Sequence, residues 1–362
     1  MADGGLVLDG LTKRYGALTP LDRITVTIPD DAYVSLLGPS GAGKTVLLRV
    51  IAGFEPPDAG AVRLGGQRID DMPAHLRGIG FVFQNFALFP HLSVRDNIGF
   101  GLAYRAIGPV RAAPALRRQV EEMIALVGLE GLGDRGVHQI SGGQRQRVAL
   151  ARTLVTEPKL VLLDEPLGAL DANLRLRMRG ELRRIRERLG VTFLHVTGSD
   201  TEALAIGDRV IVLDRGRVAQ FDTPDAVYNQ PASAQVARFL NCYNIFPGRH
   251  DGSQFVSEIA AFPLAGASVS GASPTGEPAY CIRQDLIRIR ADDGPPNAGE
   301  AALTADFITS EYSGAALTYF FETSRGRVVE VEAHLSHREP VELEPRRRYT
   351  LAWQADQAVV FG

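Results

Sequence analysis

Residues 38–45 read Gly38-Pro39-Ser40-Gly41-Ala42-Gly43-Lys44-Thr45. They match the pattern G-x-x-x-x-G-K-S/T at every fixed position. An apolar run, Ala32–Leu37, precedes them, and a helix-like run, Val46–Ile51, follows. In this strand–loop–helix context, glycines let backbone N–H groups point at phosphate oxygens, and the helix presents its positive end to the same phosphates. The segment therefore predicts a phosphate-binding loop.

Four side chains in and beyond this loop predict phosphoryl transfer. Lys44 is expected to reach the outer phosphates, and the Thr45 hydroxyl to ligate Mg²⁺, a hard ion that prefers oxygen. Downstream, the apolar run Leu160–Leu163 ends in Asp164 and Glu165. Asp164 is expected to hold Mg²⁺ through water and Glu165 to polarise the attacking water, because phosphoryl transfer needs mainly positioning and charge stabilisation.

The first two thirds of the chain, residues 1–237, alternate apolar segments with longer helix-like stretches. The strand candidates are Ala32–Leu37, Ile79–Phe83, Leu160–Leu163, Thr192–Val196 and Arg209–Leu213. Such alternation predicts a layered α/β domain with a largely parallel sheet.

One helix is visible from its apolar spacing. Three- and four-residue intervals separate its apolar residues, which are Leu174, Met178, Leu182, Ile185 and Leu189. Seven arginines lie between Arg175 and Arg188, but Glu181 and Glu187 interrupt them and the chain carries a net charge of -3. This balance favours a solvated amphipathic helix over a nucleic-acid-binding one, so no nucleic-acid partner is expected.

Residues 238–362 have a different texture. Short alternating segments are separated by loops rich in Gly, Ala, Ser and Pro, such as Ala265–Pro278. The segments are Tyr280–Ile289, Ala316–Glu322, Val328–Ala333 and Tyr349–Ala352. They predict a small all-β barrel or sandwich.

The composition is that of an ordinary globular protein, with 45% apolar and 22% charged residues. Its two cysteines, Cys242 and Cys281, fit no metal motif and are expected to be thiols. The N-terminus resembles no signal peptide. No segment approaches the roughly 20 apolar residues needed to span a bilayer. If the chain works at a membrane, other subunits are expected to hold it there.

A second motif identifies a family. Ile140 is followed by Ser141, Gly142, Gly143 and Gln144. This segment resembles the Leu-Ser-Gly-Gly-Gln signature of ABC transporter ATPases and lies upstream of Asp164 and Glu165, as in that family. The resemblance implies a P-loop ABC ATPase domain over residues 1–237, with a helical subdomain at about 86–158. It also implies a head-to-tail dimer, homo- or hetero-oligomeric, in which Ser141 and the glycine N–H groups bind the γ-phosphate of ATP held by the opposite ATPase subunit.

The resemblance assigns further residues. Tyr15 matches the aromatic residue that stacks on adenine. Gln84 matches the glutamine that touches Mg²⁺ and senses the membrane subunit, so Gln84 joins Lys44 and Glu165 as a catalytic candidate. Residues 38–45 and Val46 are expected to contact ATP, and Gly168–Asp171 resembles the loop that connects the two sites of the dimer.

The C-terminal part resembles the regulatory TOBE or OB-like domain of importer ATPases. Asn244–Gly248 is similar to the group that serves polyamines, ferric iron and phosphonates. This implies an ATP-binding importer subunit, peripheral on the cytoplasmic face of the bacterial inner membrane, with two permeases and, indirectly, a periplasmic solute-binding protein. A role of the β domain as a dimer support without a ligand stays open.

The family pattern is broken at Gly198, where related ATPases carry a histidine that contacts the γ-phosphate. His195 lies three residues earlier, and because side chains alternate along a strand it is expected to point away, into the core or an interface.

Hydrolysis could be slow but sufficient through Glu165, or Ser199 or Asp200 could shift in, or a different ATPase partner could supply the complete site. The alternative function is a nucleotide-binding regulatory subunit without useful hydrolysis. An ABC-type ATPase acting on DNA or ribosomes is disfavoured, because the chain has a single cassette. A milder change is Val46, where the family often has a hydroxyl.

Overall fold

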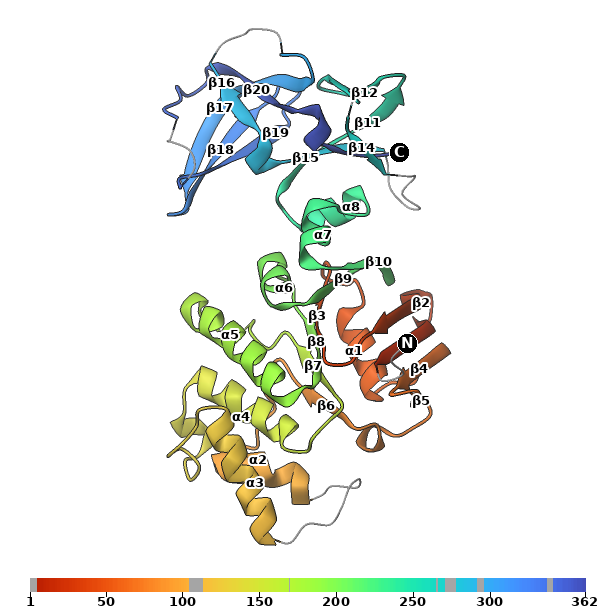
Figure 1. Cartoon of the computed structure of the whole chain (residues 1–362), viewed down its shortest axis with the longest axis vertical. Helices are drawn as coiled ribbons and strands as arrows, with labels where there is room; N and C mark the ends of the chain where they lie inside the picture. Colours follow the sequence, from red (N-terminus) through yellow and green to blue (C-terminus); the bar gives the residue numbers. More distant parts are fainter. Residues whose placement is uncertain are drawn as a thin grey trace. The chain divides into compact units, whose positions relative to one another are not determined.

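The computed structural model describes residues 5–103, 113–168, 170–264, 266–270, 278–291, 296–336 and 341–362. The chain forms two compact units, Met1–Val227 and Tyr228–Gly362 (Figure 1). The domain boundary expected at residues 237/238 lies further along the chain and stays a prediction.

A six-stranded sheet forms the centre of the first unit, in the order β10-β9-β3-β8-β7-β6. Its strands are β3 (Tyr33–Leu37), β6 (Ile79–Val82), β7 (Leu160–Asp164), β8 (Thr192–Val196), β9 (Arg209–Asp214) and β10 (Arg217–Asp222). All neighbours are parallel except β9 and β10. The predicted strands and their parallel arrangement are confirmed. The carboxyl ends of β3, β8, β7 and β6 therefore meet at one edge, where α/β sheets bind ligands.

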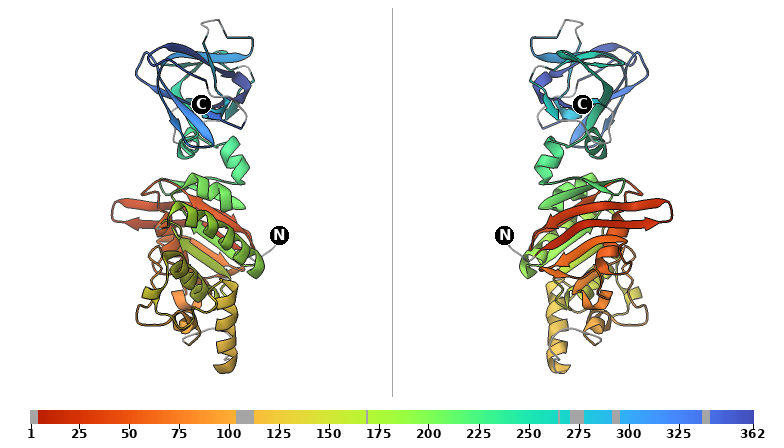
Figure 2. Two further views of the ribbon diagram at one scale, coloured as in Figure 1. Left: turned by 90° about the vertical axis from the view of Figure 1, so that its left-hand side faces the viewer. Right: turned by 90° about the vertical axis from the view of Figure 1, so that its right-hand side faces the viewer.

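A second, antiparallel sheet was not predicted from the sequence. Its order is β2-β1-β4-β5, with β1 (Leu6–Tyr15), β2 (Leu18–Ile28), β4 (Ala59–Leu64) and β5 (Gln67–Arg68). Together with helix α1 (Lys44–Ala52) it shares an apolar core with one face of the parallel sheet. Figure 2 shows its strands, in red and orange, projecting to one side of this unit.

Helices α4 (Gly142–Leu154), α5 (Ala172–Leu189) and α6 (Asp200–Ile206) cover the other face. Strand β8 shows the division, because Phe193 packs with the core of these helices and Leu194 with the core of α1. The predicted helix at residues 174–189 is confirmed as α5, whose Met178 and Leu182 are buried.

Helices α2 (Val94–Ala103) and α3 (Ala113–Leu126) pack on α4 and share its core. They fall in the range expected for a helical subdomain, whose bounds stay a prediction. Short 3-10 helices lie at Ala74–Leu76 and Val137–Gln139. No helix in the described parts of the chain is both long and apolar enough to cross a bilayer.

Helix α7 (Pro224–Asn229) contains the boundary between the units, and α8 (Ala234–Phe239) precedes the β strands of the second unit. One sheet has the order β13-β12-β11-β15-β21-β14, with β11 (Tyr243–Asp251), β12 (Gln254–Ser257), β13 (Ala261–Pro263), β14 (Ser268–Ser270), β15 (Ala279–Arg283) and β21 (Val359–Phe361). The other has the order β16-β20-β17-β18-β19, with β16 (Arg288–Arg290), β17 (Glu300–Tyr312), β18 (Ala316–Glu322), β19 (Val328–His334) and β20 (Arg348–Gln354).

The all-β prediction for this unit is confirmed, with one correction. The segment expected as one strand, Tyr280–Ile289, is split by a 3-10 turn at Gln284–Leu286, so it contributes to both sheets. The sheets enclose a single core, in which Trp353 Nε1 donates to Tyr280 Oη at 2.9 Å. Most of the predicted loop Ala265–Pro278 lies outside the described residues, but Ser268–Ser270 within it form strand β14, so the loop prediction is wrong there.

Candidate active site

The loop at residues 38–45 joins β3 to α1, and its shape requires glycine. Gly43 has a φ of 101°, and a Cβ there would lie 2.3 Å from the Pro20 carbonyl oxygen. A Cβ on Gly38 would lie 2.3 Å from the Leu213 carbonyl oxygen. A side chain at either position would push the loop away from β2 or β9 and spoil the phosphate cradle.

Lys44 begins α1 and lies inside this loop. Its Nζ donates to the carbonyl oxygens of Gly38 at 2.7 Å and Pro39 at 3.0 Å. Burial lowers the pKa of Lys44, while the charges of Glu165 and Asp164 act in the opposite direction. The ammonium group is thus bonded to the loop and attracted by the charges of both carboxylates.

The carboxylates follow β7, which is two strands from β3 in the sheet. Thr45 Oγ1 donates to Asp164 Oδ1 at 3.4 Å, a long bond that brings two of the three predicted metal ligands together. Burial raises the pKa of Asp164, and the neighbouring charge of Glu165 raises it further. A cation placed between these groups would relieve both effects, because it favours the ionised carboxylate.

Glu165 is held in an unusual conformation. Its φ is 45°, a region that non-glycine residues rarely adopt, and its N–H donates to the Val196 carbonyl oxygen at the end of β8. Gln84, just beyond β6, donates from Nε2 to Glu165 Oε2 at 3.1 Å. Backbone strain that the surroundings maintain is common at functional sites. Gln84 thus holds the carboxylate of Glu165, and Val196 holds its backbone.

Gln84 also has a physical connection to α4. The carbonyl oxygens of Phe86 and Ala87 accept hydrogen bonds from Arg152, at 2.9 and 2.7 Å. Asn97, fully buried in α2, donates to the Phe89 carbonyl oxygen and accepts from the Phe89 N–H group. The segment that follows Gln84 is therefore anchored to two helices.

The predicted metal ligands suit Mg²⁺ by their chemistry. Thr45, Asp164 and Gln84 offer hydroxyl, carboxylate and amide oxygens, the hard donors that Mg²⁺ prefers. The contact between Thr45 and Asp164 and that between Gln84 and Glu165 bring these donors to one edge of the sheet.

Two further residues predicted to contact ATP are Tyr15 and Val46. Tyr15 ends β1, is 44% exposed and donates a hydrogen bond to Glu55 through its hydroxyl. Its ring lies 5.5 Å from Lys13 Nζ. Val46 is half-buried and packs against the core of α1 and the antiparallel sheet. The missing hydroxyl at this position is thus replaced by an apolar packing contact.

The signature residues form the start of α4 rather than part of the loop. Ser141 is the N-cap: its Oγ accepts from Gln144 N at 3.3 Å, and its N–H donates to Gln144 Oε1 at 2.8 Å. A Cβ on Gly143 would lie 2.9 Å from the Leu174 side chain, so glycine allows α4 and α5 to approach. Ala169 of the predicted dimer loop lies outside the described residues.

Gly198 follows β8 and faces open space, because a Cβ there would meet no atom within 4 Å. Ser199 is engaged as the N-cap of α6, accepting from Glu202 N at 3.2 Å. The Asp200 carboxylate accepts from Thr201 N at 2.7 Å. Both side chains proposed as substitutes for the histidine therefore already serve α6. The prediction for His195 is confirmed: it is fully buried, with Nδ1 2.8 Å from Tyr33 Oη.

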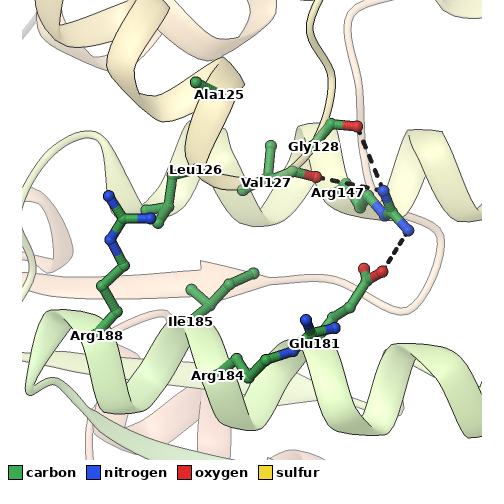
Figure 3. A pocket seen from close by; sticks show the side chains of 9 residues that line it. All are labelled: Ala125, Leu126, Val127, Gly128, Arg147, Glu181, Arg184, Ile185 and Arg188. Carbon is green, nitrogen blue, oxygen red and sulfur yellow. Dashed lines mark hydrogen bonds and ion pairs between the residues drawn. The ribbon is translucent and has the colours of Figure 1, made fainter.

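A hollow of about 350 Å³ lies away from this site, between α3, α4 and α5 (Figure 3). Arg147 of α4 spans it and donates to Glu181 of α5 at 2.6 Å. The same guanidinium donates to the carbonyl oxygens of Val127 and Gly128, each at 3.4 Å. The hollow is thus a junction at which one arginine ties the signature helix to its neighbours.

Comparison with known proteins decides the family. The family described as ABC transporter matches residues 21–168, and that described as TOBE domain matches residues 280–361. A spermidine/putrescine import ATP-binding protein of Nitratidesulfovibrio vulgaris is 38% identical over 359 residues, covering 97% of this chain and 95% of that protein. The chain belongs to the ABC transporter family. It is the nucleotide-binding ATPase of such a transporter, with a C-terminal TOBE domain, as the signature motif predicted.

Other proteins similar to this ABC transporter ATPase support the same conclusion. A Haemophilus influenzae Fe(3+) ions import ATP-binding protein is 40% identical over 324 residues, covering 89% of this chain and 95% of that protein. A Burkholderia mallei sulfate/thiosulfate import ATP-binding protein is 41% identical over 328 residues, covering 91% of each. A dimeric ATP-binding cassette solved with ADP and Pi gives a TM-score of 0.54 at 30% identity, covering 60% of this chain and 98% of that one. The predicted P-loop fold is confirmed, and a regulatory subunit without hydrolysis is not favoured.

Proposed function

We propose that this chain is the ATP-binding subunit of an importer and that it hydrolyses ATP at the edge of the parallel sheet. The main support is that Lys44, Glu165 and Gln84, which follow three different strands, lie at one edge of the sheet. The import role is supported by the relatives, whose names describe import ATP-binding proteins.

Each side chain has a distinct task in this proposal. Lys44 exchanges its loop carbonyls for the β- and γ-phosphates and offsets their charge. Glu165, fixed by Gln84 and by the Val196 carbonyl group, orients the attacking water. Mg²⁺, held by Thr45, Asp164 and the Gln84 amide oxygen, would neutralise charge on the phosphate oxygens. Catalysis of this kind depends on positioning and electrostatics more than on covalent chemistry.

Binding across a dimer gives the signature its task. The Ser141 hydroxyl and the N–H groups at the start of α4 are hydrogen-bond donors that suit a phosphate. They serve ATP held by a second ATPase subunit, either a second copy of this chain or a different one. The dimeric cassette found among similar structures supports this arrangement.

The permeases are proposed to dock at a groove of about 1050 Å³ between α2 and α3. Its apolar lining includes Leu92, Phe100 and Leu116, which suits a short apolar helix of a membrane subunit. The Phe100 ring lies 4.3 Å from that of Phe89, which Asn97 ties into the segment following Gln84. Movement of a docked permease can thus reach Glu165.

This proposal places the chain at the cytoplasmic face of the bacterial inner membrane, held there by its permeases. A periplasmic binding protein would deliver the solute. Polyamines, ferric iron and phosphonates are the solutes to test first. Relatives of similar identity carry the names of polyamine, iron and sulfate systems. Solute contacts are therefore expected on the permeases and the binding protein.

The hydrolytic part of the proposal is tested by phosphate release from Mg-ATP, using the full chain with Glu165→Gln beside Glu130→Gln. Glu130 is exposed and lies in the turn after α3, so this control makes the same chemical change away from the site. Loss of an activating carboxylate is expected to lower kcat ~100-fold or more. Equal rates in the two variants, or no nucleotide-dependent turnover at all, would reject the proposal.

The docking part is tested with chain and permeases co-expressed in vesicles. Phe100→Glu is expected to abolish co-purification with the permeases and to leave ATP binding intact, because it places a charge where an apolar helix of a permease would pack. Tyr312→Glu, on an exposed residue of β17, is the matched control. Retention of the permeases by Phe100→Glu would place the docking surface elsewhere.

A further inference from the structure

A buried polar cluster lies behind the active site, between the parallel sheet and α6. It consists of Tyr33 of β3, His195 of β8 and Glu202 of α6. Tyr33 and His195 are 1% and 0% exposed and Glu202 is 4% exposed, so the cluster is closed to solvent. Polar groups at such depth are costly unless they satisfy one another.

The two ring nitrogens of His195 face different partners. Its Nδ1 lies 2.8 Å from Tyr33 Oη, and its Nε2 lies 2.9 Å from Glu202 Oε1. The distance between Nε2 and Glu202 Oε1 is that of an ion pair, but the angle does not suit a hydrogen bond. Because a carboxylate faces Nε2, that nitrogen carries a proton, while Nδ1 forms the hydrogen bond with the Tyr33 hydroxyl. Three elements are thus joined through one imidazole.

The surrounding charges fit this arrangement. Burial acts to raise the pKa of Glu202, but His195, Thr197 and the charge of Arg179 outweigh it, and the pKa lies below its usual value. Burial and the charges of Glu202 and Asp208 raise the pKa of Tyr33 well above its usual value. The cluster therefore contains an ionised carboxylate and a neutral phenol.

The cluster adjoins the backbone that holds Glu165. Val196, the residue after His195, provides the carbonyl oxygen that accepts the Glu165 N–H at 3.1 Å. Thr197 N donates to the Leu36 carbonyl oxygen at 3.1 Å, just before the phosphate loop. The end of β8 is thus in contact with both the attacking side and the phosphate side of the site.

From these contacts, and resting on the proposed function, we infer that His195 is a positioning residue for ATP hydrolysis. Anchored by Tyr33 and Glu202, it fixes the end of β8, and the Val196 carbonyl group in turn holds Glu165 in its strained conformation. The position of Glu165 is especially important in this chain, because Gly198 provides no side chain to stabilise the γ-phosphate from β8.

The test measures kcat and KM for ATP in His195→Phe, His195→Gln and Tyr33→Phe. His195→Phe is expected to lower kcat ~10-fold with KM nearly unchanged, because a small displacement of a catalytic group is costly while the phosphate loop stays intact. His195→Gln retains a hydrogen-bond donor and an acceptor, so its kcat is expected to stay closer to that of the wild type than the kcat of His195→Phe. Tyr280→Phe is the matched control, since it removes another buried tyrosine hydroxyl that is hydrogen-bonded, in the β domain.

A second measurement separates positioning from general stabilisation. In single-turnover phosphate release, adding His195→Phe to Glu165→Gln is expected to cause little further loss, because both changes act on one carboxylate. Rates for the folded fraction equal to those of Tyr280→Phe, or full additivity with Glu165→Gln, would overturn the inference. If His195→Phe does not fold, Tyr33→Phe takes its place, because it removes the hydroxyl that anchors His195 and is expected to lower kcat relative to Tyr280→Phe. An inactive wild type would instead reject the proposed function, so the two failures are distinguishable.

Discussion

The active site has two regions that are built differently. The phosphate side is the loop at residues 38–45, and the β8 side is formed by the residues that follow β8. On the phosphate side, Lys44 and Thr45 supply polar side chains from a loop that glycines shape around the ligand. On the β8 side, the position where related ATPases carry a histidine is occupied by Gly198, which has no side chain and open space around it. We therefore expect substitutions on the phosphate side to act mainly on ATP binding, and those on the β8 side to act mainly on turnover.

The largest effect is expected on the phosphate side, from Lys44→Ala. Replacing charge-assisted hydrogen bonds worth ~1.5–3 kcal/mol each should weaken ATP binding about 100-fold. Equilibrium binding of a fluorescent ATP analogue checks this, with Lys159→Ala, an exposed lysine before β7, as the control. Undiminished affinity in Lys44→Ala would show that the loop does not bind the phosphates as proposed.

A smaller effect in the opposite direction is expected on the β8 side, from Gly198→His. The Cβ fits without contact, and a donor to the γ-phosphate should raise kcat by ~10-fold or more, by analogy with single donors that stabilise developing charge. ATP affinity should stay nearly constant. Gly198→Ala, which adds the Cβ alone, is the control for backbone effects.

Either outcome at Gly198 sharpens the comparison. A raised kcat means that hydrolysis in the wild type is slow because one contact is missing. An unchanged kcat means that Glu165, Gln84 and the signature of the second subunit already suffice. A partner ATPase that supplies the histidine is tested in the same assay by mixing the candidate subunits.

The difference between the two sides also explains what the sequence could predict. The P-loop and the strands β3, β7 and β8 follow from short-range patterns, because the loop needs glycines at fixed spacing and buried parallel strands are continuous apolar runs. The departure at Gly198 was visible because Thr201–Leu204 keeps the family register. These features depend on neighbours in sequence.

Features that depend on distant residues were missed. The antiparallel sheet was not predicted because β1 pairs with β2 through several register shifts, which break the two-residue alternation. The strained Glu165 and the cluster around His195 arise from contacts between strands that are far apart in sequence. His195 was predicted as buried, but its partner Glu202 has no signal of its own, because a lone glutamate in a helix is normally exposed.

On the phosphate side, Val46 also departs from the family pattern, which often has a hydroxyl there. Restoring that hydroxyl should change ATP affinity less than Lys44→Ala does. Val46→Ser adds a hydroxyl beside Thr45 but removes apolar packing at a half-buried position. We expect ATP affinity to rise by no more than ~3-fold, with a loss of about 1 kcal/mol in the free energy of unfolding. Binding and urea titrations on the same samples check both, with Val46→Thr as the variant that keeps the branched shape.

The smallest effect is expected from Glu202→Gln, measured as stability rather than rate. The pKa of Glu202 lies below its usual value of 4.5, so ionised Glu202 stabilises the folded state at neutral pH. This contribution is present above the unfolded pKa and lost as pH falls through the lower folded pKa. The wild type should therefore be more stable than Glu202→Gln by about 1 kcal/mol at pH 7, and the difference should shrink as the pH falls below that usual value.

The two units of the chain provide the control for this measurement. The only tryptophan, Trp353, is buried in the β unit, so its fluorescence follows that unit alone. Far-UV circular dichroism is dominated by the long helices of the ATPase unit. Because Glu202 contacts His195 and Ser199, which belong to the ATPase unit, the dichroism transition should shift and the tryptophan transition should not. A shift of equal size in both signals, or one that does not depend on pH, would mean that the carboxylate of Glu202 is not what holds the end of β8 in place.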